Sequence, residues 1–162
     1  MNSNIKKLTL GAVLLALTFV ITRFIQIPIP LGYFNIGNSV ILLGCLLVPM
    51  GYGVIAGGVG SALADLTSYP VYTLPTLIIK SIMPAIFYLM LKLPIKKDFV
   101  KSVLAFAVAT LLPLFGYTLT GCILYGFVAG LAQFPGLLLE YVANIVVFSA
   151  FYKPFKEIAK RI

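Results

Sequence analysis

Four charged residues lie inside apolar stretches of the sequence, where charged groups are rare: Arg23, Asp65, Lys80 and Glu140. Placing each such group inside a bilayer costs about 2.5–3.5 kcal/mol or more, so intramembrane charges usually mark a ligand or ion path. An ammonium group near carboxylates could bind a polar ligand or act as an acid and a base. The alternative interpretation is two buried ion pairs that only lock helices together.

The sequence argues against several kinds of active site. It contains no histidine and only four acidic residues, so we expect no metal site. It has no GxxxxGK[ST] phosphate-binding loop, so we expect no ATP hydrolysis by this chain itself. Cys45 and Cys122 lie in apolar runs and are expected to behave as small hydrophobic residues. We therefore predict a protein that is not an enzyme and has no cofactor.

The composition identifies the surroundings of these residues. The chain has 162 residues, of which 61% are hydrophobic and 10% charged, and its mean hydropathy is +1.10. A soluble domain of this size has about 25% charged residues. The apolar stretches are too long and too numerous for one buried core, which predicts a polytopic membrane protein. We expect a single membrane domain over residues 1–162.

Prolines, glycines and charged segments divide the chain into six apolar segments. The predicted spans cover, approximately, residues 9–26, 37–48, 51–66, 74–91, 100–125 and 135–151. The second and third are shorter than the ~20 residues that cross a bilayer perpendicularly, so they are expected to rely partly on their neighbours. The predicted fold class is an all-α integral membrane protein, a compact bundle of six transmembrane helices.

Most of the charged residues gather in three clusters, at residues 6–7, 92–101 and 153–161. With six spans, all three clusters fall on the same side of the membrane. Their ten basic and two acidic residues account for the whole net charge of +8. By the positive-inside rule this side is cytoplasmic, so both termini are predicted to be cytoplasmic. The positive charge is therefore a topology signal, and we expect no nucleic-acid binding.

The four isolated charges fall in the outer half of the predicted bundle, where polar and aromatic residues also gather. A pocket open to the outside explains this preference for one leaflet, whereas structural ion pairs would show none. Glu140 and Asn144 are four residues apart and share one helix face. Four residues are predicted to contact the ligand: Glu140, Asn144, Lys80 and Tyr117. Three more are predicted to close the pocket from outside: Tyr33, Asn35 and Tyr72. Loops 27–36 and 67–73 are predicted to form a movable lid.

Small residues dominate the segment 51–70, which is otherwise apolar. Gly53, Gly57 and Ser61 recur every four residues, a spacing that lets helix backbones approach closely in lipid. We therefore predict that the third span is the close-packed centre of the bundle. Asp65, at its outer end, is expected to anchor the following loop or to pair with a buried basic residue, rather than to contact the ligand.

Four stretches of the sequence resemble the substrate-binding S components of energy-coupling factor (ECF) vitamin transporters: KKLTLGAVLLAL, YFNIGNSVILL, VIAGGVGSALADL and SYPVYTLPTLIIK. The group that they resemble most takes up hydroxymethylpyrimidine or pyridoxine. The resemblance covers residues 6–91 well, and the last two spans agree mainly in length, polarity and topology.

This resemblance implies a six-helix subunit that captures a small vitamin, or a vitamin precursor, at its outer face. A transmembrane coupling (T) subunit and two cytoplasmic ATPase subunits would then supply the energy for uptake. The family's Ala-x-x-x-Ala docking motif on the first span matches Ala12 and Ala16. The implied location is a bacterial plasma membrane.

Two other functions stay open from the residues alone. A self-sufficient small-solute transporter or channel would be expected to show internal repeats or charges across the full membrane depth, and we find neither. A membrane enzyme is less favoured. Lys80 and Glu140 could serve as acid and base, but the sequence positions no nucleophile beside them.

Overall fold

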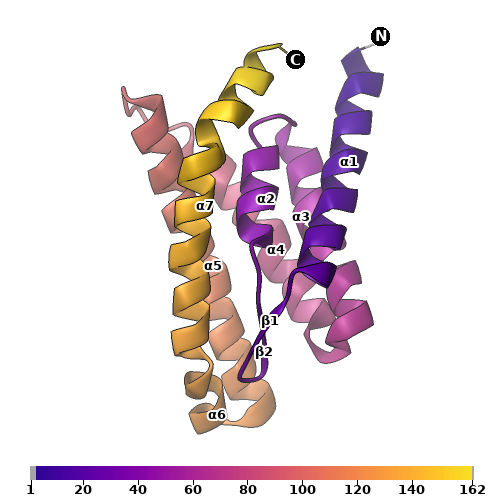
Figure 1. Cartoon of the computed structure of the whole chain (residues 1–162), viewed down its shortest axis with the longest axis vertical. Helices are drawn as coiled ribbons and strands as arrows, with labels where there is room; N and C mark the ends of the chain where they lie inside the picture. Colours follow the sequence, from indigo (N-terminus) through magenta and orange to yellow (C-terminus); the bar gives the residue numbers. More distant parts are fainter. Residues whose placement is uncertain (1–2, 162) are drawn as a thin grey trace.

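Helices make up most of the chain in the computed structural model, which describes residues 3–161 (Figure 1). The α-helices are α1 (Ser3–Phe24), α2 (Gly37–Gly44), α3 (Met50–Ser68), α4 (Thr73–Met90), α5 (Asp98–Tyr125), α6 (Phe127–Ala132) and α7 (Phe134–Arg161). A short 3₁₀ helix, η1 (Pro70–Tyr72), precedes α4. The strands β1 (Ile27–Ile29) and β2 (Gly32–Phe34) pair antiparallel, and we call residues 27–34 the β-hairpin.

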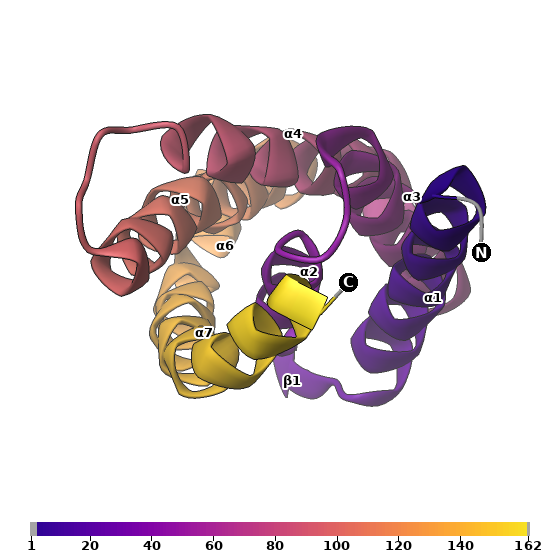
Figure 2. The same cartoon turned by 90° about the horizontal axis from the view of Figure 1, so that it is seen from above.

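Four helical stretches are long and apolar enough to cross a membrane: residues 4–24, 70–90, 98–125 and 127–161. This agrees with the predicted all-α membrane class, while the six-span topology stays a prediction. α2 has only 8 residues and, at 1.5 Å per residue, is far too short to cross a bilayer. Figure 2 shows α2 inside a ring formed by the longer helices, so protein rather than lipid surrounds most of it.

α1 and α7 extend beyond the predicted spans at the end of the molecule where both termini lie (Figure 1). α1 begins at Ser3 rather than at residue 9. α7 continues past Phe151 to Arg161, and its polar last turns pair with the start of α5. There, the Lys156 Nζ atom lies 3.6 Å from the Asp98 Oδ2 atom. We call this the basic end of the bundle, because all three basic clusters lie near it. Its cytoplasmic location stays a prediction. The opposite end carries the β-hairpin and is called the hairpin end.

α3 packs closely against both α1 and α4, as its small residues predict. A methyl group added at Gly57 would lie 2.8 Å from the backbone oxygen of Lys80, and one at Gly60 would lie 2.9 Å from that of Leu15. Both distances are shorter than ordinary van der Waals contact, so larger residues would push the helices apart. The glycines therefore fix where α4 places Lys80 relative to α3.

The hydrophobic core fills the half of the bundle nearer the basic end. Its largest buried side chains come from α4, α5 and α7, and the rings of Phe106 and Phe148 lie 4.4 Å apart between centroids. α2 contributes Ile41 and Leu42, both fully buried. Packing of this density gives the helices fixed positions. Buried polar residues gather instead in the half nearer the hairpin end.

Candidate functional site

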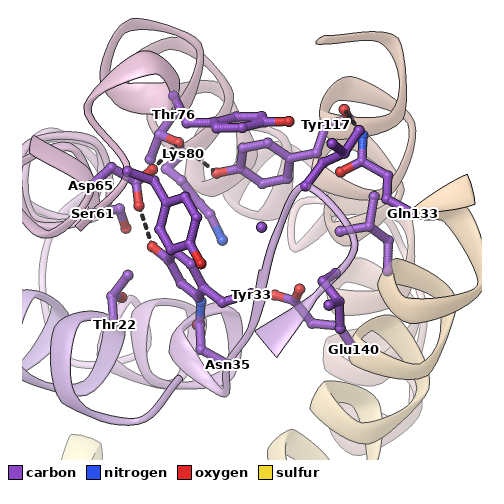
Figure 3. Close-up of a pocket in the computed structure, with 16 residues that line it drawn as sticks. Thr22, Tyr33, Asn35, Ser61, Asp65, Thr76, Lys80, Tyr117, Gln133 and Glu140 are labelled. Atoms are coloured by element: carbon purple, nitrogen blue, oxygen red, sulfur yellow. Dashed lines mark hydrogen bonds between the residues drawn. The ribbon is translucent and has the colours of Figure 1, made fainter. Parts of the chain in front are cut away.

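A cavity of ≈ 480 Å³, its mouth included, lies at the hairpin end and is lined by the β-hairpin, η1 and every long helix (Figure 3). The helices place their polar side chains toward a common space there, whereas the same helices pack apolar side chains together nearer the basic end. The cavity is therefore the candidate binding site.

The β-hairpin covers one side of this cavity. Gly136 at the start of α7 lets it pack closely, because a methyl group there would lie 3.0 Å from the Ile29 Cγ2 atom. The turn of the hairpin contains Leu31 with φ of 62°, a conformation that residues other than glycine seldom adopt. Leu31 also lines the cavity. The hairpin is thus held by α7 and presents its strained tip to the site.

Asp65 is the centre of a hydrogen-bond network that joins the hairpin to α4 and α5. Its carboxylate accepts hydrogen bonds from the Tyr33 hydroxyl and the Thr76 hydroxyl. The Thr76 hydroxyl has a single hydrogen, which it donates to Asp65. The Tyr117 hydroxyl therefore donates to the Thr76 oxygen, 3.0 Å away. Burial and the Asp65 carboxylate raise the pKa of the Tyr33 phenol, which keeps it protonated as a donor. Asp65 therefore anchors the hairpin and faces the cavity.

Lys80 and Glu140 are linked through an amide rather than by direct contact. The Lys80 ammonium donates to the Asn38 Oδ1 atom, and the Asn38 amide nitrogen donates to the Glu140 Oε1 atom at 3.3 Å. Lys80 and Glu140 are 3% and 6% exposed. Within residues 3–161 the direct ion pairs lie near the basic end, at Asp98 and Glu157. Thus neither of these two cavity residues is used up by an ion pair.

Tyrosine rings form another part of the wall. Tyr72 packs edge-on against Tyr117, with ring centroids 6.2 Å apart, and lies 6.4 Å from the Tyr125 ring. The Lys80 Nζ atom lies 5.6 Å from the centroid of the Tyr117 ring. Aromatic walls beside a cation and carboxylates are suited to a flat ring that carries polar substituents.

The structure brings six of the seven predicted pocket residues to this cavity: Glu140, Lys80, Tyr117, Tyr33, Asn35 and Tyr72. Asn144 lies outside the lining. Its amide oxygen accepts from the Ser39 backbone nitrogen at 2.9 Å, and its amide nitrogen donates to the Asn35 backbone oxygen at 2.8 Å. Asn144 shares a helix face with Glu140 but does not line the pocket. Its amide is already hydrogen-bonded to Ser39 at the start of α2 and to the backbone of Asn35 just before it. We assign it a positioning role.

Six other polar residues line the cavity and were not predicted as ligand contacts: Thr22, Ser61, Asp65, Tyr69, Thr76 and Gln133. Asp65 was expected only to be architectural, and the small-residue pattern of α3 gave Ser61 a packing role. Gln133 is buried, and its side-chain nitrogen donates to the Tyr117 backbone oxygen at 2.9 Å. Arg23, in contrast, is outside the lining and stacks over Phe24 at 5.6 Å.

The four isolated charges of the sequence balance one another, but the cavity wall contains only three of them, because Arg23 lies outside it. Lys80 is its only cation among the described residues, whereas Asp65 and Glu140 are both carboxylic acids. Such a wall favours a neutral or positively polarised ligand and disfavours an anionic one, because like charges brought together cost several kcal/mol.

This fold and site define a multi-pass helical membrane protein with a polar cavity at one end. Comparison with known families narrows it. The chain belongs to the family of S components of ECF-type riboflavin transporters, which matches residues 2–157. This is a family of transporter components and not of enzymes. The chain is also similar to a Pyrococcus woesei protein described as an “uncharacterized protein in gap 3′ region”. The two are 33% identical over 130 residues, which cover 79% of this chain and 86% of that protein.

Proposed function

We propose that the chain captures a neutral heteroaromatic vitamin with hydroxyl-bearing substituents in the hairpin-end cavity, for ATP-driven uptake by partner subunits. One observation carries this proposal: a single cavity joins an ammonium group, two carboxylic acids and tyrosine rings beneath a hairpin cover. Membership in the S-component family supports it, because such subunits bind substrate for an ECF transporter.

Three vitamins or precursors fit this chemistry. Riboflavin comes first because the family is described by it. Hydroxymethylpyrimidine and pyridoxine follow, because the quoted stretches of sequence resemble S components for those compounds. All three have a flat heteroaromatic ring with nitrogen acceptors, which can accept from Lys80, and hydroxyls, which can donate to Glu140. Tyr72 and Tyr117 can flank such a ring.

The proposed partners are a transmembrane coupling subunit and two cytoplasmic ATPase subunits. Ala12 and Ala16 lie exposed on α1, one helical turn apart, so their side chains are accessible to a partner. Beside α1 lies an apolar groove of ≈ 800 Å³, between α1 and α7 with α2 as its floor. We propose that the coupling subunit packs over this face, with the alanines allowing close backbone approach.

The proposed orientation follows from the charge distribution. With the basic end in the cytoplasm of a bacterial plasma membrane, the cavity opens to the outside, where a vitamin is captured. The docking alanines then lie toward the cytoplasmic side. Capture and docking would occupy different parts of α1.

A ligand panel tests the proposal. The purified chain is titrated by calorimetry with riboflavin, hydroxymethylpyrimidine and pyridoxine, and with riboflavin phosphate as a charged counterpart. We expect one neutral compound to bind at 1:1 stoichiometry and the phosphate ester to bind at least ~10-fold more weakly, because it would face Asp65 and Glu140. Equal binding of ester and parent vitamin would contradict the proposed charge preference, and binding of none of the vitamins would reject the function.

The β-hairpin is predicted to move when the vitamin enters. Its tip lines the cavity, so a bound ligand would shield a cysteine placed at Leu31, whereas Val128 on α6 lies 82% exposed at the same end. In a background without Cys122, we expect saturating vitamin to slow labelling of Leu31→Cys by a membrane-impermeant thiol reagent about tenfold. The matched Val128→Cys variant should label at an unchanged rate. Equal slowing or no slowing at both positions would contradict a lid.

A further inference from the structure

Besides the Tyr72 phenol on η1, two buried hydroxyl groups in the cavity wall have no hydrogen-bond partner anywhere in residues 3–161. These are the Thr22 Oγ1 atom on α1 and the Ser61 Oγ atom on α3. Thr22 is 2% exposed and Ser61 0%, and both line the cavity. Leaving a buried hydroxyl unpaired is unfavourable, since its lost hydration is not replaced. Both groups therefore remain available to a bound molecule.

Several threonines elsewhere in the long helices hydrogen-bond to their own backbone. Thr110, Thr118 and Thr120 each donate to the carbonyl four residues earlier at 2.8 Å. This local bond is the ordinary arrangement for threonine in an apolar helix. Thr22 lacks it, so its hydroxyl is directed away from its own backbone.

Gly37, the first residue of α2, packs closely against Thr22. A methyl group added at Gly37 would lie 2.7 Å from the Thr22 Oγ1 atom and 2.5 Å from the Asn35 Oδ1 atom. The Gly37 backbone nitrogen does not satisfy Thr22, because it donates to Asn35 at 2.6 Å. Any larger residue at this position would cover the hydroxyl. Gly37 therefore allows α2 to approach Thr22 closely without covering its hydroxyl.

Figure 3 shows Thr22 and Ser61 next to each other on the wall formed by α1 and α3. Gln133 and Glu140 lie on the opposite side of the cavity. Ser61 is also one helical turn before Asp65, which disfavours an anionic group at this place. The α1–α3 wall therefore offers two unpartnered hydroxyls beside the Asp65 carboxylate, which already accepts hydrogen bonds from Tyr33 and Thr76.

We infer that Thr22 and Ser61 form a subsite for an alcohol group on the side arm of the ligand, while the opposite wall holds its ring. A hydroxyl both donates and accepts, so paired protein hydroxyls match a hydroxymethyl or polyol group of the ligand. They offer no charge with which to bind a phosphate or carboxylate. This inference rests on the proposed function and specifies how the ligand is oriented in the cavity.

Matched ligands and isosteric variants test this subsite. Thr22→Val and Ser61→Ala are titrated with riboflavin and with lumiflavin, which has the same ring but a methyl group in place of the polyol arm. If the ligand panel selects pyridoxine instead, the matched pair is pyridoxine and 4-deoxypyridoxine. Each variant should bind the hydroxyl-bearing vitamin about tenfold more weakly, as for a lost hydrogen bond, and the analogue with unchanged affinity.

Thr18 provides the matched control. It lies one turn before Thr22 on α1, is fully buried and also lacks a partner among the described residues, but it does not line the cavity. Thr18→Val should leave the affinity for both ligands unchanged. Without ligand, all three variants should unfold at the wild-type temperature or above it, because a methyl group replaces or removes an unsatisfied hydroxyl.

The outcomes separate the subsite from the proposed function. Equal losses for the vitamin and its analogue would overturn the subsite and show a structural effect. Unchanged vitamin affinity in both variants would also overturn it, while the vitamin-binding function would stand. If the wild-type chain binds neither ligand of either pair, the proposed function itself fails and takes the subsite with it.

Discussion

Purified Lys80→Met and Glu140→Gln variants are expected to bind the vitamin at least about 30-fold more weakly than the wild-type chain. Removing one partner of a buried, charged hydrogen bond typically costs about 2–5 kcal/mol. Both side chains line the cavity, are almost fully buried and are linked only through Asn38. Each therefore keeps bonding capacity for a ligand. Calorimetric titration measures the change.

The double variant adds a sharper check of this link. Because Lys80 and Glu140 share Asn38, their effects should be coupled and the double variant should lose less affinity than the product of the two single losses. Lys153→Met, at an exposed position near the basic end, is the control and should bind normally. Unchanged affinity in both single variants would place the binding site elsewhere.

A tryptophan at Ala12 or Ala16 is expected to abolish co-purification with the coupling module and ATP-dependent uptake. Both alanines are exposed on α1, the helix that also forms one side of the apolar groove, so bulk there would keep a partner helix from approaching. The cavity is lined by residues from Thr22 onward, at the far end of α1. Vitamin binding by the isolated chain should therefore stay within about twofold of wild type, since well-separated sites act independently.

Leu104→Trp is the matched control for docking, because Leu104 is an exposed apolar residue on a different helix, α5. This variant should assemble and transport normally. Loss of vitamin binding together with assembly in the alanine variants would show that the stripe serves packing within the chain. Normal uptake by the Ala12 and Ala16 variants would remove the docking proposal.

Much of the helical framework could be predicted from the sequence, because each long helix coincides with an apolar run between breakers. The β-hairpin could not. The residues 27–34 have the composition of an outer loop, and nothing local shows that they fold back to cover a cavity. The end of α2 at Gly44 could not be predicted from the sequence either, because the apolar run continues past it through a turn to Pro49.

The charged part of the site was predictable for a physical reason. Lys80 and Glu140 stand out because lipid does not tolerate isolated charges. Thr22 and Ser61 do not stand out, since most hydroxyls in apolar helices bond to their own backbone and only coordinates show which do not. Asp65 was assigned to the architecture alone, whereas its hydrogen bonds serve the hairpin and the cavity together.

The central claim is that this chain alone binds a vitamin and leaves it chemically unchanged. Equilibrium dialysis of the purified chain, in the absence of any ATPase subunit, with recovery and mass analysis of the ligand, tests it most directly. We predict saturable binding of one vitamin per chain and complete recovery of the unmodified compound, with binding reduced in Glu140→Gln. Recovery of an altered compound, or no saturable binding of any of the three candidates, would contradict this account.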